Sequence, residues 1–492
     1  MAMKNLLESL PAHAVLLSNG QHALNREELQ QRIDDVCQAL LARAAPRAPV
    51  AVLADNDPQW LVIDLATQAL DLVLVPLPLF FTPAQWGHIL AQSGAQALFC
   101  ADPQHAAALG FGRAVPCDGP LGLHENEHAA TSPTEALDGI QKITFTSGTT
   151  AAPKGVCLSS AQQWDVARAL HAGLVDLRLR RHLCLLPFAV LLENVAGPYT
   201  ALLDGATVIC PPLADVGMRG ASGFDPERCL AAIAHYQPHS IILVPQMLQA
   251  LVAAAEAADP RIRSLRFVAV GGGKTSAGLL AAARERGFPV YEGYGLSECA
   301  SVVALNLRGA TRTGSVGRPL AHRAVRIADD GEIMVQSGAP RYLGQHTPPG
   351  DWLASGDLGR LDEDGFLFVE GRKKDILITA YGRNVSPEWP EAVLTGTGAI
   401  GQALVVGEAQ AHLAALLVPA HAGIDAAALQ SAVERANAEL PDYARLQRWC
   451  VVEPFSPANG LLTANGRPRR LQILARHAGV IASLFDQPET IQ

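Results

Sequence analysis

The sequence has few of the features that mark disulfide-rich, metal-binding or nucleic-acid-binding proteins. Its nine cysteines stand alone, without a CxxC pair or a Cys/His ligand spacing, which argues against a disulfide framework and a zinc finger. We expect them as small buried residues in a reducing compartment. The formal charge is −9, and no stretch concentrates Lys and Arg between aromatic residues. Nucleic acid is therefore excluded as a partner.

Long apolar runs are also missing. Glu8, Pro11 and His13 interrupt the apolar run that a signal peptide would need near the start of the sequence. No later stretch reaches the roughly 18 uninterrupted apolar residues of a transmembrane helix. We therefore expect no signal peptide, no transmembrane segment and a cytoplasmic location. Charged residues make up only 17% and hydrophobic residues 49% of 492 residues, which predicts a globular chain of two or more units.

Short apolar runs alternate with helical patterns in the first part of the chain. Strands are expected at 49–55, 72–77 and 97–101, with a helix over 60–70 between the first two. A second helix is well delimited, with Thr82 as N-cap, Gln85 closing a capping box and Gly94 at its end. Such alternation is typical of a parallel sheet with crossover helices.

The same pattern continues and then changes. Further strands are expected at 206–210, 240–244, 265–270 and 288–291, with a helix near 276–287. The DDG and EDG turns within 325–335 and 359–371 predict antiparallel hairpins. An α+β segment follows, with strands 403–407, 414–419 and 449–454 and a helix over 426–439. The fold class is therefore α/β: a large multi-layer N-terminal domain (1–371) with parallel sheets and a β subdomain, and a small mobile α+β C-terminal domain (372–492).

The most specific local feature is ITFTSGTTAAPKGV, residues 143–156. An apolar strand-like run ends in a loop of small and hydroxyl residues that carries one lysine, Lys154, and this composition suits the binding of a polyphosphate. The loop is not a Walker P-loop, because neither Ser nor Thr follows Lys154. The residues expected to contact phosphate are Thr146, Ser147, Gly148, Thr149 and Thr150.

This loop resembles the signature loop of the adenylate-forming superfamily, which includes acyl-CoA synthetases, peptide-synthetase adenylation domains and firefly-type luciferases. The family pattern has Gly where this chain has Ala151. The resemblance implies ATP and Mg²⁺ as requirements and a thiol as the acyl acceptor. Later motifs in the family's order extend the resemblance over nearly the whole chain.

In EGYGLSECA (292–300), the resemblance implies that Tyr294 stacks on adenine, Ser297 contacts phosphate and Glu298 holds Mg²⁺. Gly295 belongs to the same motif. Gly271, Gly272 and Gly273 end a predicted strand and let the backbone approach adenine or the acyl group closely. Lys274, which follows them, receives no role.

Two further motifs flank the expected domain boundary. Asp357 resembles the family's ribose-binding aspartate, and Arg372 its second ribose or phosphate contact. Lys374 matches the hinge between the lobes, and Gly382 the glycine that lines the pantetheine tunnel. The sequence of the motif AYGRNVSPEWPE (380–391) most resembles the fatty acyl-CoA synthetase branch of the family.

The last motif, LLTANGRPRR (461–470), departs from the family. Relatives place Lys after the Gly, where this chain has Arg467. In the family that Lys stabilises charge on the carboxylate and α-phosphate during adenylation. Arg467 keeps the charge in a longer, forked side chain. Three interpretations are possible: Arg467 replaces the lysine, Arg469 replaces it, or adenylation is slow or lost.

The acyl pocket is expected after the strand at 183–188. Glu193, in the same stretch, is expected on a helix surface. No clear acidic partner for a substrate amine is found, which favours an apolar acid over an amino acid. The residues expected to form the pocket are Leu191, Val195, Ala196, Gly197, Cys299, Ala300 and Ser301.

The resemblance implies that a carboxylic acid is activated as acyl-AMP, with Lys154, Glu298 and Arg467 as the catalytic residues, and is then transferred to coenzyme A. The first alternative is a stand-alone acyl-AMP ligase that loads the phosphopantetheine of an acyl carrier protein. A luciferase-like monooxygenase and a silent nucleotide-binding homologue are further alternatives. A kinase is disfavoured because its motifs are missing.

Overall fold

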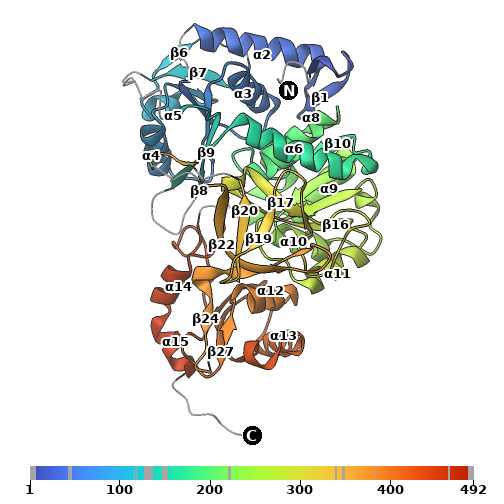
Figure 1. Cartoon of the computed structure of the whole chain (residues 1–492), viewed down its shortest axis with the longest axis vertical. Coiled ribbons are helices and arrows are strands. Elements are labelled where there is room, and N and C mark those ends of the chain that lie inside the picture. Colours follow the sequence, from blue (N-terminus) through green and yellow to red (C-terminus); the bar gives the residue numbers. More distant parts are fainter. Residues whose placement is uncertain are drawn as a thin grey trace.

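The computed structural model describes residues 7–42, 47–115, 117, 119–126, 137–146, 153–219, 223–337, 341–345, 350–381, 383–463 and 466–485. Figure 1 shows a large N-terminal body with the C-terminal lobe below it, joined through a group of long antiparallel strands. Of the predicted site residues, Ser147, Gly148, Thr149, Thr150 and Gly382 lie outside the described residues.

The first large sheet has the strand order β21-β9-β8-β4-β3-β5-β7-β6. Strands β8, β4, β3 and β5 run parallel, and antiparallel strands lie on both sides of them. The strands are β3 (Pro49–Leu53), β4 (Val73–Pro76), β5 (Ala97–Cys100), β6 (Arg113–Val115), β7 (Gly122–Glu125), β8 (Lys142–Thr146), β9 (Lys154–Leu158) and β21 (Arg341–Tyr342).

The second large sheet has the order β18-β17-β16-β15-β14-β10-β11-β1-β2. Its centre is parallel, and β2, β17 and β18 are antiparallel additions at its two edges. Both sheets are thus mixed, not purely parallel. The strands are β1 (Val15–Ser18), β2 (Ala23–Asn25), β10 (Arg181–Leu183), β11 (Thr207–Ile209), β14 (Ser240–Leu243), β15 (Phe267–Val270), β16 (Val290–Leu296), β17 (Ser301–Leu305) and β18 (Arg318–Pro319).

Helices cover both faces of each sheet, so the parallel strands are buried on two sides. On β3, Val50 and Val52 face one core, and Ala51 and Leu53 face another. This explains why these strands read as continuous apolar runs. Between the sheets lie α2 (Arg26–Leu41), α3 (Pro58–Ala69) and α6 (Ser160–Leu174); the outer layers are α4 (Pro83–Ser93) and α5 (Pro103–Ala108) on one side and α9 (Pro226–Tyr236), α10 (Pro245–Ala254) and α11 (Ala277–Glu285) on the other.

Local signals placed several elements correctly. The α4 helix begins with the predicted capping box of Thr82 and Gln85, and it ends at Gly94 in the left-handed conformation. The two predicted hairpins form an antiparallel sheet of order β19-β20-β22-β23. Its strands are β19 (Val325–Ile327), β20 (Glu332–Gln336), β22 (Trp352–Leu361) and β23 (Leu367–Arg372).

The C-terminal lobe is an α+β unit, as expected. Its sheet has the order β26-β27-β28, and the predicted helix over 426–439 is α13. The fold class is therefore confirmed. The elements are β24 (Leu377–Ile378), β25 (Asn384–Val385), α12 (Glu388–Gly396), β26 (Ile400–Val406), β27 (Leu413–Pro419), α13 (Ala426–Glu439), β28 (Leu446–Val451), α14 (Arg470–Arg476) and α15 (Ala478–Phe485).

Two general expectations concern cysteines and membranes. All nine cysteines are free thiols; six are buried, and Cys37, Cys117 and Cys450 are half-buried. In the part of the chain that the structure describes, no helix combines the length and the apolar character that a bilayer crossing requires.

Candidate active site

The phosphate-loop motif joins the antiparallel strands β8 and β9, next to the edge strand β21 of the first sheet. Thr146 ends β8 and is paired with Lys154, the first residue of β9. Lys154 is exposed. The hairpin therefore holds the predicted phosphate lysine and one predicted hydroxyl side by side at the two ends of the loop.

Three predicted nucleotide-binding residues form one hydrogen-bonded group. The hydroxyl of Tyr294 on β16 donates to Asp357 Oδ2 at 2.6 Å, and Arg372 Nε lies 3.0 Å from Asp357 Oδ1. Burial raises the pKa of Asp357, while Arg372 counteracts that rise. The group links β16 of the second sheet to β22 and β23, which lead into the C-terminal lobe.

The predicted metal carboxylate has a partner that the sequence reading missed. Glu298 lies in the single turn of 3₁₀-helix Ser297–Cys299, which directly follows β16 and its Gly295. The hydroxyl of Tyr342 on β21 donates to Glu298 Oε1 at 2.8 Å. Burial and the nearby Glu298 raise the pKa of Tyr342, so the phenol keeps its proton and remains a donor.

The glycine run follows β15 and faces the start of α7 (Leu191–Asn194). A Cβ on Gly271 or Gly272 would lie 3.8 Å or 3.7 Å from the side chain of Leu192. Leu192 is therefore the α7 residue that faces the glycines. The prediction named its neighbour Leu191, which is buried in the core together with Val195.

The remaining residues expected in the acyl pocket do not line one common space. Cys299 packs into the core of the antiparallel sheet with Val303 and Ile333. Ala300 is buried in the main core and adopts a left-handed conformation, with φ of 62°. Ser301 begins β17 and is also buried. Ala196, like Leu192, is half-buried and packs against the main core.

The expectation of a surface position for Glu193 was wrong. Its side chain is fully buried, and three hydrogen bonds compensate for this burial. Oε1 lies 2.8 Å from His182 Nε2, and Oε2 accepts from the backbone N–H groups of Leu185 and Leu186 at 3.1 and 2.8 Å. The carboxylate is therefore fully engaged inside the protein and is not free for a substrate group.

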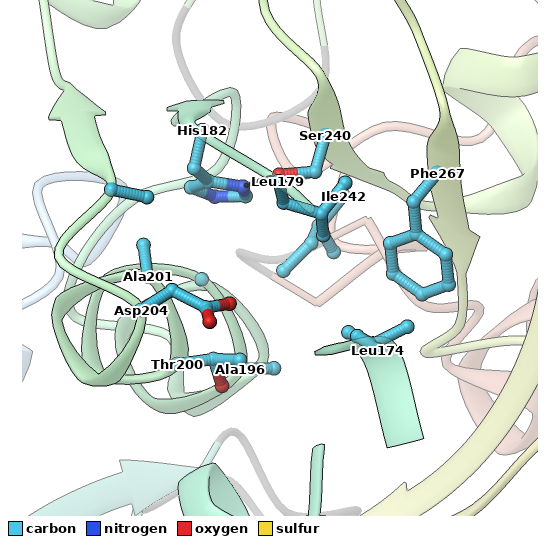
Figure 2. A pocket seen from close by; sticks show the side chains of 12 residues that line it. Leu174, Leu179, His182, Ala196, Thr200, Ala201, Asp204, Ser240, Ile242 and Phe267 are labelled. Atoms are coloured by element: carbon cyan, nitrogen blue, oxygen red, sulfur yellow. Dashed lines mark hydrogen bonds between the residues drawn. The ribbon is translucent and has the colours of Figure 1, made fainter. Parts of the chain in front are cut away.

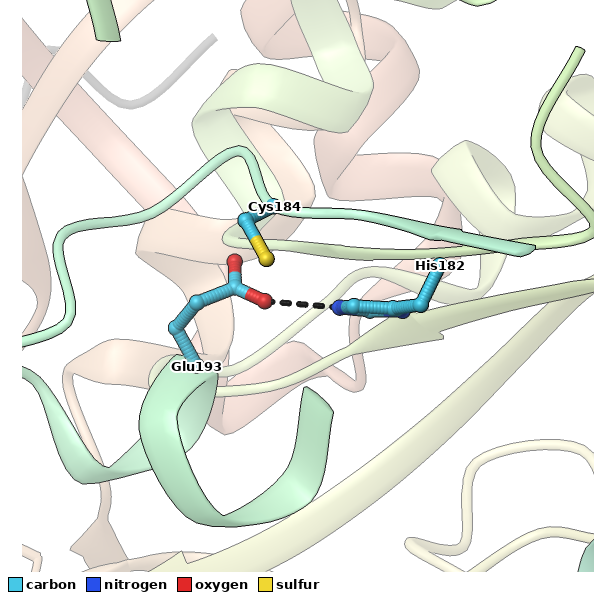
Figure 3. Close-up of side chains that lie close together, drawn as sticks. All are labelled: His182, Cys184 and Glu193. Carbon is cyan, nitrogen blue, oxygen red and sulfur yellow. Dashed lines mark hydrogen bonds and ion pairs between the residues drawn. The ribbon is translucent and has the colours of Figure 1, made fainter. Parts of the chain in front are cut away.

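The thiol of Cys184 reaches the same carboxylate (Figure 3). His182, Cys184 and Glu193 offer nitrogen, sulfur and oxygen atoms within 4.8 Å of one another. However, His182 Nδ1 is also 3.0 Å from Ser240 Oγ, and burial raises the pKa of Cys184 well above its usual range. A protonated thiol beside a hydrogen-bonded His182–Glu193 pair belongs to a buried hydrogen-bonded network and not to a thiolate metal centre.

A small cavity lies behind this network, against the irregular π-helix Val195–Tyr199 that follows α7. Figure 2 shows strand residues such as His182 and Phe267 on one side and helix residues such as Ala196 and Thr200 on the other. Its volume of about 20 Å³ fits about one water molecule. Ala196 and Gly197 therefore border a space that is too small for an acyl chain.

A buried ion pair connects the phosphate-loop strand to the same helical segment. Lys142, at the start of β8, donates to Asp64, Asn194 and Tyr199 at 3.0, 2.6 and 3.0 Å. Asp64 Oδ2 also accepts from Asn194 and Tyr199. Burial lowers the pKa of Lys142, and Asp64 opposes that shift. All three protons of the ammonium group are therefore satisfied without water.

Arg467 reaches from the C-terminal lobe to the glycine run. Its Nη2 lies 3.5 Å from the carbonyl oxygen of Gly272. Desolvation of the guanidinium and the nearby Arg372 lower the pKa of Arg467, whereas Glu388, Asp357 and Glu298 raise it. The residue as a whole keeps exposed surface, and only its tip enters this charged region. The structure thus brings Arg467 together with the Tyr294–Asp357–Arg372 group.

The Arg467 loop is fixed to its own lobe. Arg467 N–H donates to Thr463 Oγ1 at 2.9 Å, and Arg470 forms an ion pair with the half-buried Glu391. Burial raises the pKa of Glu391 to about 7, with Arg470 opposing the shift. The predicted hinge residue Lys374 is exposed, while its neighbour Lys373 pairs with Asp330 and Glu332.

The chain was compared with known protein families. The family described as "AMP-binding enzyme" matches residues 7–349, and "AMP-binding enzyme C-terminal domain" matches residues 374–489. The chain belongs to the AMP-binding enzyme family. The predicted membership of the adenylate-forming superfamily is therefore confirmed, and the chain is an enzyme of the acid–CoA ligase (AMP-forming) type that adenylates a carboxylic acid.

Individual relatives differ in the acids that their names state. Feruloyl-CoA synthase from Amycolatopsis is 31% identical over 426 residues, covering 80% of this chain and 82% of that enzyme. Long-chain-fatty-acid–CoA ligase FadD15 from Mycobacterium bovis is 28% identical, covering 75% and 72%. The structure of anthranilate CoA ligase AuaEII with anthranoyl-AMP shares the fold, with a TM-score of 0.79, 19% identity and 98% coverage of both chains.

Proposed function

We propose that this enzyme activates a fatty or other apolar carboxylic acid as its acyl-AMP, using ATP and Mg²⁺, and transfers the acyl group to coenzyme A. The observation that carries the proposal is the approach of Arg467 to Gly272, which completes a charged site formed by both lobes. We further propose a domain boundary at residues 371–372, with the hinge near Lys374.

The first step is a displacement at phosphorus. A carboxylate oxygen of the acid attacks the α-phosphorus of ATP, the bond between that phosphorus and the bridging oxygen breaks, and pyrophosphate leaves. Lys154 and the hydroxyl loop that follows Thr146 bind the leaving phosphates, and Arg467 stabilises charge where the carboxylate and α-phosphate meet. Asp357 accepts hydrogen bonds from the ribose, which fixes the nucleotide.

The donor chemistry around Glu298 fits Mg²⁺. This ion is bound in nucleotide sites by one or two carboxylates together with substrate phosphates, and Glu298 offers such a carboxylate in a half-buried position. When bound, Mg²⁺ supplies charge neutralisation at the phosphates. Glu298 itself would orient the ion beside the α-phosphate.

In the second step the thiol sulfur of coenzyme A attacks the acyl carbon. The bond from that carbon to the phosphate oxygen breaks, AMP leaves, and the thiol proton passes to solvent. We propose that the C-terminal lobe turns about Lys374 before this step, withdrawing Arg467 and bringing Gly382 toward the thiol path.

The apolar class of acid is supported by the residues beside the glycine run. Leu192 and Val244, which lie closest to Gly272, are apolar, and Glu193 is engaged by His182 and the backbone. The relatives named above include a feruloyl-CoA synthase and a long-chain-fatty-acid–CoA ligase, which supports an aryl or a fatty acid as the substrate.

Mass spectrometry of the purified enzyme with ATP, Mg²⁺ and a panel of fatty and aryl acids tests the proposal. Acyl-CoA and AMP should form when coenzyme A is present, and acyl-AMP when it is omitted. Acyl-AMP that coenzyme A does not consume would favour a stand-alone ligase for a carrier protein or another acceptor. Nucleotide binding without any adenylate would contradict the proposal.

A further inference from the structure

Tyr342 connects the two parts of the proposed phosphate and metal site. It lies on β21, which pairs with β9 so that Tyr342 is opposite Val156. The β9 strand begins with Lys154, the predicted phosphate lysine. On its other side, the Tyr342 hydroxyl donates to Glu298 at 2.8 Å. One side chain therefore spans from the phosphate-lysine strand to the metal carboxylate of the second sheet.

The backbone that carries Tyr342 is fixed from several directions. The N–H of Leu343 donates to Gly155 at 2.9 Å, and the Arg341 guanidinium donates to the carbonyl of Asp138 at 2.8 Å. Leu343 packs against the apolar core behind β9. The lack of a side chain at Gly155 permits this close approach of Leu343, because a Cβ at position 155 would lie only 3.1 Å from the Leu343 side chain. The phenol is therefore carried by a strand that is paired with β9.

The hydrogen bond from the Tyr342 hydroxyl limits how the Glu298 carboxylate can be oriented. Glu298 has two oxygens, and a hydrogen bond to Oε1 restricts rotation of the group and leaves Oε2 for another ligand. Outer partners of this kind orient metal-binding side chains, and their loss typically weakens metal affinity by about 10–100-fold.

We propose that Tyr342 is a positioning residue for the metal carboxylate Glu298, and that its hydroxyl sets the affinity of the enzyme–nucleotide complex for the divalent cation. This inference rests on the proposed function, in which Glu298 holds Mg²⁺. It adds a second consequence: since Tyr342 and Lys154 lie on paired strands, cation affinity is tied to the position of the phosphate-lysine strand.

The test compares the wild-type protein with Tyr342→Phe, which removes only the hydroxyl. Binding of Mn²⁺ is measured by electron paramagnetic resonance in the presence of α,β-methylene-ATP, which cannot release pyrophosphate. We expect the Mn²⁺ dissociation constant to rise about tenfold or more. In turnover assays, saturating Mg²⁺ should restore most of kcat, because the hydroxyl acts only through Glu298.

Tyr443→Phe, at an exposed tyrosine of the C-terminal lobe, is the matched control and should bind Mn²⁺ like the wild type. An unchanged dissociation constant in Tyr342→Phe would overturn the proposal. Glu298→Gln distinguishes a failure of this inference from a failure of the proposed function. Wild-type Mn²⁺ binding in Glu298→Gln would remove the metal role from Glu298 and end this inference, whereas a wild-type enzyme that adenylates no acid would contradict the proposed function alone.

Discussion

Gly197 is required by the network around Glu193 and not by backbone conformation. A Cβ at this position would lie 2.4 Å from His182 Nε2 and 2.6 Å from Glu193 Oε1. Gly197→Ala should therefore displace the buried His182–Glu193 hydrogen-bonded pair and lower the free energy of unfolding by about 1–3 kcal/mol. Gly278→Ala, in open space on α11, should be neutral or slightly stabilising. Urea unfolding of both variants measures the difference, and equal stabilities would contradict it.

The buried Lys142–Asp64 pair should show strong coupling in a double-mutant cycle. Lys142→Met leaves the Asp64 carboxylate buried without its cation, and we expect a loss of about 3–5 kcal/mol in stability. Adding Asp64→Leu removes the stranded charge and should recover much of that loss. Thermal unfolding of both single variants and the double variant provides the test. A double variant as unstable as the sum of the singles would show that the pair acts as two independent residues.

At the scale of elements, Glu292 on β16 contributes a pH dependence. Burial raises its pKa from 4.5 to about 7, although the N–H of Thr275, in the loop between β15 and α11, donates to it. The folded state thus binds more protons than the unfolded state between about pH 4.5 and 7, so this group's contribution to stability falls as pH rises through that window. Above pH 7 its contribution stays constant.

Glu292→Gln should accordingly give a smaller decline in Tm between about pH 4.5 and 7 than the wild type. The exposed Glu285→Gln serves as the control and should follow the wild-type curve. Differential scanning calorimetry across this range makes the comparison. If the three curves run parallel, Glu292 titrates in the folded protein as it does in the unfolded chain.

Elements with strong local signals could be predicted from the sequence. The capping box at Thr82, the hairpin turns and the span of α13 depend on residues a few positions apart. The surface position predicted for Glu193 was wrong because the hydrogen-bond partners of its carboxylate do not belong to the local helical pattern. Its partners are supplied by β10 and the loop after it, and a helical pattern alone does not reveal that a carboxylate will be compensated there.

The site was predictable at the level of motifs and not at the level of side-chain direction. Tyr294, Asp357 and Arg372 were named and lie together. The prediction named Leu191 instead of Leu192, because a step of one residue turns the side-chain direction by about 100° around a helix and the motif does not fix which residue faces the site. Tyr342 and Lys142 were missed since their partners are 44 and 52 to 78 residues away, and neither belongs to a motif.

At the scale of the whole molecule, α12 of the C-terminal lobe contacts α10 and the start of α11 in the N-terminal body. Gln249 donates to the carbonyl of Thr395 at 2.7 Å, and a Cβ on Gly396 would lie 2.4 Å from Ser276 Oγ. Gly396→Leu should thus oppose this arrangement of the lobes. We expect slower adenylation but unchanged conversion of supplied acyl-AMP and coenzyme A to acyl-CoA.

Separate assays of the two half-reactions measure this effect. Ser276→Gly in the same chain should partly restore adenylation, because it removes the side chain that the leucine meets, and Gly is tolerated at a helix N-cap. Equal losses in both half-reactions would mean that the substitution damages the fold and not one arrangement of the lobes.

The most direct test of the account concerns Arg467, which joins the two lobes at the proposed reaction centre. Acid-dependent exchange of labelled pyrophosphate into ATP should fall about a hundredfold or more in Arg467→Ala, as expected when a group that stabilises transition-state charge is removed. Arg469→Ala should exchange like the wild type, and thioester formation from supplied acyl-AMP should persist in both variants. Wild-type exchange in Arg467→Ala, or a comparable loss only in Arg469→Ala, would contradict the role assigned to Arg467.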